Sequence, residues 1–197
     1  MNDFFTDIFR GAPFLAILRG FSVERTLELA TAAWDAGISA VEIPAQSPEA
    51  IETLRIVAAA GQARGAIVGA GTIISVDQVE AVRAAGARFT VAPGFDSVVA
   101  QASEDAGLAH LPGVGTASEI QAVLTTGRTW VKAFPADALG ERWFAGMRGP
   151  FPHLNIVATG GMSADNAEQF LAAGANVISL GSALADPAQI AKISHLI

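Results

Sequence analysis

The sequence predicts a (β/α)8 barrel, or TIM barrel, built as one domain over residues 1–197 with a short N-terminal helix. Eight short apolar runs alternate with alanine-rich amphipathic stretches, at a spacing of roughly 20 to 28 residues. Several runs are nearly continuous in Val, Ile, Leu and Ala, which is typical of parallel strands covered on both faces. This alternation, without a linker or a low-complexity tract, favours a closed barrel. The competing architecture is an open doubly wound sheet, but no Gly-x-Gly-x-x-Gly motif follows the first run.

The predicted elements follow from these runs and from the turn residues between them. The strands are expected at residues 14–18, 40–43, 66–70, 89–92, 108–111, 130–134, 154–158 and 176–180. An additional helix is expected over residues 2–10. Helix starts are predicted by caps at Ser22, Ser47 and the 163–165 segment, and the first of these helices should end near Gly37. Left-handed residues that follow helix ends are predicted at Gly61, Gly86, Gly107, Gly127 and Gly174.

Composition limits the classes of partner and the compartment. A net charge of −7 argues against nucleic acid or an anionic membrane as the main partner, although a small anionic substrate remains possible. The absence of cysteine excludes disulfides, a thiol nucleophile and a cysteine-bound metal. No signal peptide is evident at the N-terminus, and no apolar run is long enough to span a membrane. We therefore expect a cytoplasmic protein.

Lys132 is the most informative residue, because it is one of only two lysines and lies inside an apolar run. Desolvation disfavours the ammonium form and lowers the pKa of a lysine. An amine that is neutral part of the time can attack a ketone and form a Schiff base. The alternative is a lysine at a strand end whose charged head reaches water.

Barrel enzymes place their active sites at the carboxyl ends of the strands, so the chemistry of this chain is expected there. Arg19, Glu42 and Lys132 are the charged residues in or ending the predicted strands, apart from Arg88 at a strand start. Burial would raise the pKa of Glu42, which suits a group that gives and takes protons; the alternative is a structural carboxylate paired with an arginine. His110 is predicted to be structural. No His, Asp or Glu cluster has metal-ligand spacing, so we expect neither a metal nor a cofactor.

Two glycine-containing pairs follow the last two predicted strands. They are Gly160–Gly161 and Gly181–Ser182. Phosphate sites of barrels often lie there, where backbone N–H groups face an anion. Either pair alone would suggest a simple turn, but their joint occurrence predicts a phosphate site.

These residues together resemble the short class I aldolases that cleave 2-keto-3-deoxy-6-phospho sugar acids. The matching pieces run almost end to end: Ala16-Ile17-Leu18-Arg19-Gly20, Ala40-Val41-Glu42-Ile43-Pro44, Ser47-Pro48, Gly69-Ala70-Gly71-Thr72, Pro112-Gly113, Lys132-Ala133-Phe134-Pro135-Ala136, Gly160-Gly161 and Gly181-Ser182. The first three are most similar to the 2-dehydro-3-deoxy-6-phosphogalactonate aldolases. Gln46 stands where phosphogluconate-type relatives carry an arginine. Thr159 is instead as in the phosphogluconate type, at a position linked to C4 stereochemistry.

The resemblance implies a mechanism and a set of site residues. Lys132 would form the Schiff base and Glu42 would shuttle protons, giving pyruvate and glyceraldehyde 3-phosphate. Arg19 and Thr72 would hold the substrate carboxylate, and Pro93 and Phe134 would shape the pocket. The phosphate would lie at Gly160, Gly161, Gly181 and Ser182. The resemblance also implies a homotrimer.

Other functions remain open at this point. The substrate could be 2-dehydro-3-deoxy-6-phosphogluconate or 4-hydroxy-2-oxoglutarate instead. A phosphate-binding barrel isomerase or epimerase could use Glu42 without an imine. The same scaffold could also serve as a non-catalytic sugar-phosphate sensor, because a fold does not determine a function.

Overall fold

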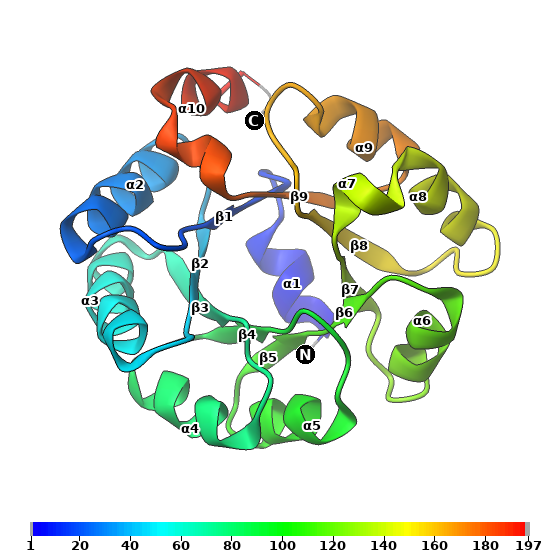
Figure 1. The fold of residues 1–197 in the computed structure, drawn as a ribbon, viewed down its shortest axis with the longest axis horizontal. Helices are drawn as coiled ribbons and strands as arrows, with labels where there is room; N and C mark the ends of the chain where they lie inside the picture. Colours follow the sequence, from blue (N-terminus) through cyan, green and yellow to red (C-terminus); the bar gives the residue numbers. More distant parts are fainter. Residues whose placement is uncertain (1, 196–197) are drawn as a thin grey trace.

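The computed structural model of the protein describes residues 2–195 and has the predicted barrel architecture. Figure 1 shows a ring of parallel strands surrounded by helices. The strands pair in the order β5-β4-β3-β2-β1-β9-β8-β7-β6. Every pairing between neighbours is parallel. The (β/α)8 prediction is therefore confirmed.

All eight predicted apolar runs form strands. The strands are β1 (Phe14–Ile17), β2 (Ala40–Pro44), β3 (Ile67–Gly71), β4 (Phe89–Val91), β5 (Ala109–Leu111), β6 (Gly113–Val114), β7 (Trp130–Ala133), β8 (Asn155–Thr159) and β9 (Val177–Leu180).

The two-residue strand β6 was not predicted, and it arises because the fifth barrel strand is interrupted at Pro112. Proline has no N–H to donate to a ladder, so regular pairing stops there. β5 pairs with β4 on one side, and β6 pairs with β7 on the other. The Pro112 carbonyl still accepts a hydrogen bond from the Lys132 amide at 2.8 Å. The segment over residues 109–114 thus joins β4 to β7 and closes the ring.

The helices lie outside the ring, except for the first. They are α1 (Asn2–Ile8), α2 (Val23–Asp35), α3 (Pro48–Arg64), α4 (Val76–Ala84), α5 (Ser97–Asp105), α6 (Ala117–Leu124), α7 (Ala136–Leu139), α8 (Glu141–Arg148), α9 (Ala167–Ala173), the 3-10 turn η1 (Ser182–Ala185) and α10 (Pro187–Ile193). Ser22 and Ser47 cap α2 and α3 as predicted, each accepting a backbone N–H. The 163–165 segment is a turn, and α9 has Asn166 as its N-cap.

The prediction that Gly61 follows a helix end is wrong. α3 continues to Arg64, and the left-handed residue is Gly65, with φ 72°. Position 61 lies inside the helix, and close packing explains why it is a glycine. An added Cβ would lie 2.8 Å from Val68 and 3.2 Å from Trp34. The other predicted left-handed glycines have positive φ as expected, namely Gly86, Gly107, Gly127 and Gly174.

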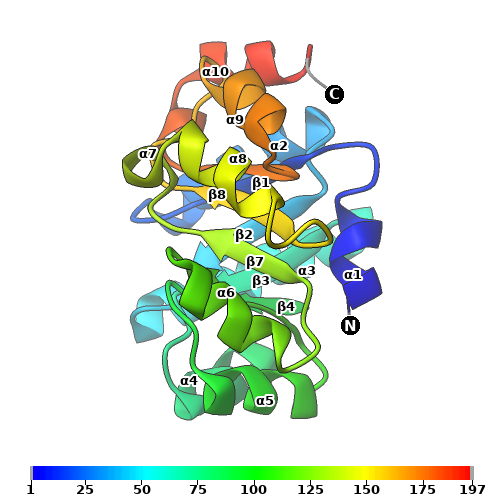
Figure 2. The same cartoon turned by 90° about the vertical axis from the view of Figure 1, so that its right-hand side faces the viewer.

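Two apolar layers hold the barrel together. The larger one lies between the strands and the outer helices. The smaller one fills the barrel interior and contains Phe89 and Trp130 together with Phe5 of α1 and Phe9 of the turn that follows it. The Phe5 ring lies 6.0 Å from each of the Phe89 and Trp130 rings, centroid to centroid. Helix α1 therefore covers the amino-terminal end of the barrel, as Figure 2 shows from the side, and leaves the carboxyl end for ligands. Within residues 2–195, no helix combines the length and the apolarity that crossing a membrane requires.

Candidate active site

Four polar side chains point into the barrel near the carboxyl ends of the strands. They do so because side chains alternate between the two faces along each strand. Ala40, Trp130, Val157 and Val177 belong to the interior layer. The residue two positions later in each strand shares that face and is polar: Glu42, Lys132, Thr159 and Ser179. All four are buried.

A cavity of about 610 Å³ lies at the carboxyl ends of β1, β7, β8 and β9. It brings together eight of the predicted site residues: Arg19, Lys132, Phe134, Thr159, Gly160, Gly161, Gly181 and Ser182. Ile17, Phe21, Met162, Ser163, Ser179 and Ala183 complete the wall. The volume is in the range of small-molecule sites, so one phosphorylated sugar acid would fit.

Lys132 has the environment that the sequence predicted. Its side chain is 4% exposed, and its ammonium nitrogen lies 4.9 Å from the centre of the Phe134 ring. Desolvation lowers the pKa of Lys132, the Glu42 carboxylate opposes that shift, and the Arg19 guanidinium adds to it. Such an amine loses its proton more readily than an exposed lysine, as a nucleophile requires.

Glu42 is fully buried, and neither of its carboxylate oxygens has a hydrogen-bond partner. Burial raises the pKa of Glu42, while the charges of Lys132 and Arg19 act against that rise. The carboxyl group fits only because residue 71 is a glycine: a Cβ there would lie 1.8 Å from Glu42 Oε1. An unpartnered buried carboxyl is costly unless it has a function, and proton transfer to a bound substrate would supply one.

Arg19 and Thr72 meet at the edge of this site. The Arg19 guanidinium donates to the Thr72 hydroxyl at 3.2 Å. Thr72 has φ 61°, the left-handed region, which a β-branched residue rarely adopts. Strained backbone of this kind clusters at ligand sites.

The loop after β8 contains two left-handed glycines, Gly160 with φ 97° and Gly161 with φ 71°. The Gly160 carbonyl accepts from the Asp137 amide at 3.2 Å, and the Gly161 carbonyl accepts from the Asn166 side chain at 2.9 Å. With both carbonyls occupied, the loop geometry is fixed. The Asp137 carboxylate lies beside Gly161, because an added Cβ there would be 2.6 Å from Asp137 Oδ2.

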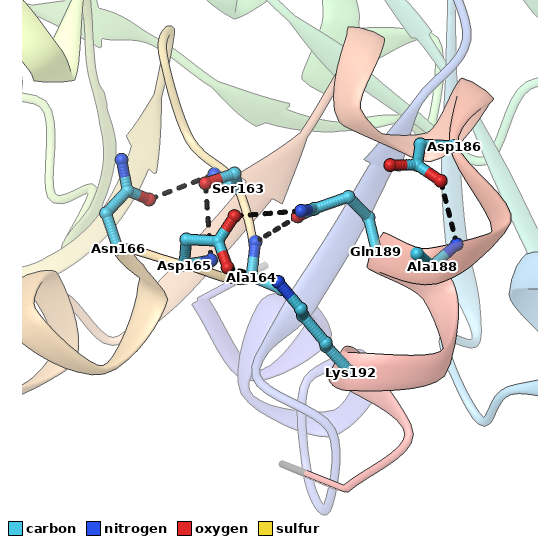
Figure 3. A network of polar contacts seen from close by, with 8 residues as sticks. All are labelled: Ser163, Ala164, Asp165, Asn166, Asp186, Ala188, Gln189 and Lys192. Atoms are coloured by element: carbon cyan, nitrogen blue, oxygen red, sulfur yellow. Dashed lines mark hydrogen bonds and ion pairs between the residues drawn. The ribbon is translucent and has the colours of Figure 1, made fainter.

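Helix α10 supports the same loop from the other side (Figure 3). The Gln189 side chain accepts from the Ala164 amide at 2.8 Å and donates to Asp165 at 2.9 Å. Lys192 also donates to Asp165, at 2.5 Å. Lys192, the second lysine of the chain, thus stabilises this loop and does not line the cavity.

Some residues lie elsewhere than the sequence suggested or were missed by it. Pro93 lines a separate hollow of about 230 Å³ with Ile73 and Phe95. Ser179 was missed, although it accepts from the Thr159 hydroxyl at 3.1 Å inside the cavity wall. The signal was available: Ser179 lies in the predicted strand over residues 176–180, two positions before the predicted phosphate-site residue Gly181.

His110 is structural, as predicted. It points outward from β5 and lies 2.9 Å from the Thr90 hydroxyl, which also donates to Ser103 of α5. Burial, helped by the charge of Arg128, lowers the pKa of His110 to about 4. A neutral imidazole between strand and helix takes no part in the cavity.

The chain is similar to known aldolases in sequence and in fold. A family model described as KDPG and KHG aldolase matches residues 5–195. A probable 2-dehydro-3-deoxy-6-phosphogalactonate aldolase of Rhizobium meliloti (strain 1021) is 34% identical over 176 residues, covering 89% of this chain and 82% of that protein. A 2-dehydro-3-deoxy-phosphogluconate aldolase of Pseudoalteromonas atlantica is 32% identical over 166 residues, covering 84% of this chain and 76% of that protein.

A solved structure extends the match to the chemistry. KDPG aldolase from Legionella pneumophila, with pyruvate captured as a covalent carbinolamine intermediate, superimposes with a TM-score of 0.83 at 29% identity, covering 96% of this chain and 94% of that one. The sequence motifs, the barrel and the family match lead to the same conclusion: the chain belongs to the KDPG and KHG aldolase family and is a class I aldolase, a lyase.

Proposed function

We propose that this aldolase cleaves 2-dehydro-3-deoxy-6-phosphogalactonate into pyruvate and glyceraldehyde 3-phosphate through an imine on Lys132. The observation that carries the proposal is the buried, electrostatically coupled pair of Lys132 and Glu42. Desolvation lowers the pKa of the amine and raises that of the carboxyl. These shifts favour a neutral nucleophile beside a carboxyl that can exchange protons.

The steps follow from these two groups. The neutral Lys132 amine attacks the C2 ketone, and loss of water gives an iminium. Glu42 takes the proton of the C4 hydroxyl while the C3–C4 bond breaks, and the electron pair moves into the iminium to form an enamine. The aldehyde leaves, Glu42 returns the proton to C3, and water hydrolyses the imine to release pyruvate and the free amine.

The remaining residues bind the two ends of the substrate. Arg19 and Thr72 bind the carboxylate at one end. The backbone N–H groups of Gly160, Gly161 and Gly181, with the Ser182 hydroxyl, bind the phosphate at the other. Phe134 forms the wall beside the reacting carbons.

The galactonate configuration is supported by the motif around Glu42 and by the glutamine at position 46. A specific observation favours the gluconate epimer as the second candidate. Thr159 presents a hydroxyl to the cavity, paired with Ser179. A hydroxyl there can bind the C4 hydroxyl of one epimer in preference to the other.

Borohydride trapping and cleavage of both epimers test the proposal. In wild type, borohydride with pyruvate should add mass to Lys132, and the galactonate epimer should give the higher kcat/KM. Lys132→Arg keeps the charge but stays protonated, so both trapping and cleavage should fall to background. Lys192→Arg is the matched control and should still be trapped.

Each rival function gives a different result. An isomerase or epimerase would turn over a sugar phosphate without any trapped adduct. A sensor would bind one with neither turnover nor adduct. Normal cleavage by Lys132→Arg would contradict the Schiff-base assignment. A homotrimer and a cytoplasmic location remain predictions, for which sedimentation and cell fractionation are the tests.

A further inference from the structure

The turn that follows β3 is held in an unfavourable conformation by one side chain. Among the described residues, Thr72 is the one non-glycine with a positive φ, 61°. A threonine in this region is disfavoured because its branched Cβ crowds the backbone. The surrounding structure must therefore hold it there.

Gln78, in the first turn of α4, provides the contacts. Its Oε1 accepts from the amides of Ile74 at 2.8 Å and Ser75 at 3.1 Å. Its Nε2 donates to the Thr72 carbonyl at 3.4 Å and to the Ala45 carbonyl at 3.1 Å. One amide group thus spans the turn over residues 72–75 from inside.

The contact to Ala45 connects this turn to the strand that carries Glu42. Ala45 directly follows β2, and its own amide donates to the Gly71 carbonyl at 2.9 Å. Gln78 therefore ties together the ends of β2 and β3. A glutamine at this helix position ordinarily accepts hydrogen bonds from the first backbone N–H groups of the helix. The two hydrogen bonds that Nε2 donates are not part of that cap.

The consequence lies at the Thr72 hydroxyl. It accepts from Arg19 at 3.2 Å, so its own proton is available for an acceptor on a ligand. If the turn relaxed to the usual φ, this hydroxyl would move away from Arg19. The pairing of Arg19 with Thr72 depends on the geometry that Gln78 maintains.

We propose that Gln78 is a positioning residue for the carboxylate end of the substrate, acting through the Thr72 turn. This inference rests on the proposed function, in which Arg19 and Thr72 bind that carboxylate. Gln78 itself touches neither substrate nor the reacting lysine. The carboxylate is bound in the ground state and the transition state alike, so loss of positioning should raise KM and leave kcat unchanged.

Two variants separate the donor contacts from the helix cap. Gln78→Glu keeps an acceptor for the Ile74 and Ser75 amides and loses both donations. Gln78→Met has a similar size, is neutral and loses all five contacts, including the one that the Ser75 hydroxyl donates to Oε1 at 3.4 Å. We expect each variant to raise KM, and the pyruvate concentration that half-saturates borohydride trapping, about tenfold, with kcat within about twofold of wild type. Asp77→Asn, in the same first turn of α4, is the matched control and should change KM by less than about twofold.

A double-mutant cycle tests whether the effect passes through Thr72. In a Thr72→Ala background, Gln78→Met should raise KM by less than about twofold further, because the hydroxyl that it positions is gone. An unchanged KM in either single variant, or a full tenfold rise again in the Thr72→Ala background, would overturn the proposal. Failure of the proposed function is seen separately, since wild type would then neither cleave the epimers nor trap pyruvate.

Discussion

At the residue scale, burial shifts the pKa values of Lys132 and Glu42, and the charge of each group opposes the shift of the other. Desolvation lowers the pKa of Lys132, the Glu42 carboxylate acts to raise it, and Arg19 acts to lower it further. Two charges of opposite sign thus act on one amine. Removing them one at a time should therefore move the titration of the amine in opposite directions.

We expect the rate of pyruvate trapping to rise with pH, with an inflection below the ordinary lysine value of 10.5. Glu42→Gln removes the charge that favours the ammonium form, so its inflection should lie at lower pH than in wild type. Arg19→Gln removes a repelling cation, so its inflection should lie at higher pH. Rapid-quench trapping across pH measures both, and shifts of the same sign would contradict the assignment.

Sequence reasoning singled out these residues because charge inside an apolar strand is rare, and the structure places Arg19 and Lys132 in the wall of one cavity. It could not find Gln78 in the same way, since a glutamine in the first turn of a helix is common. The function of Gln78 depends on two carbonyls, those of Ala45 and Thr72, which only the folded chain brings together. The left-handed φ of Thr72 was equally invisible, because threonine gives no signal for it.

At the element scale, the loop after β8 depends on helices on both sides. Asn166 precedes α9, and Gln189 and Lys192 belong to α10. Their contacts fix the loop before any ligand binds, so backbone N–H groups can face an anion without reorganisation. Such a site should be sensitive to shape more than to distant charge.

Gly161→Val should raise KM for the phosphorylated substrate by at least about tenfold. This is the effect of losing one charge-assisted hydrogen bond to the phosphate. Its φ of 71° and the approach of an added Cβ to Asp137 both exclude a side chain. Cleavage of a dephosphorylated analogue, already poor, should hardly change. Gly146→Val is the control, because space is open around Gly146 of α8. Equal losses on both substrates would place the phosphate elsewhere.

At the scale of the whole molecule, the eight apolar runs sufficed to predict the barrel, because parallel strands covered on both faces are apolar throughout. The short strand after Pro112 was not predicted, since the apolar run ends at Leu111 and Pro112–Gly113 is typical of a turn. Gly61 was misassigned because a glycine is equally compatible with a helix end and with close packing inside a helix. Only the neighbouring Trp34 and Val68 distinguish the two.

Stability should fall at acid pH because of His110. The unfolded chain binds a proton at an ordinary histidine pKa of 6.5, whereas native His110 does so only at about 4. The free energy of unfolding is thus unaffected above about pH 6.5 and falls by about 3 kcal/mol as pH drops to about 4.

Urea unfolding at several pH values measures this dependence. His110→Asn should show a flatter decline than wild type, because the titrating group is gone. His153→Asn, on the exposed segment before β8, is the control and should keep the wild-type slope. Parallel curves for wild type and His110→Asn would contradict the assignment.

The contact between Gly71 and Glu42 also limits how this sequence can diverge. Any residue other than glycine at position 71 would need the space that the carboxylate occupies. An alanine arriving there first would displace the carboxylate that we propose as the acid–base group before a compensating change could follow. Descendants of this chain can therefore abandon that glycine only after they have lost or shortened the glutamate, and a library that randomises one position should randomise both.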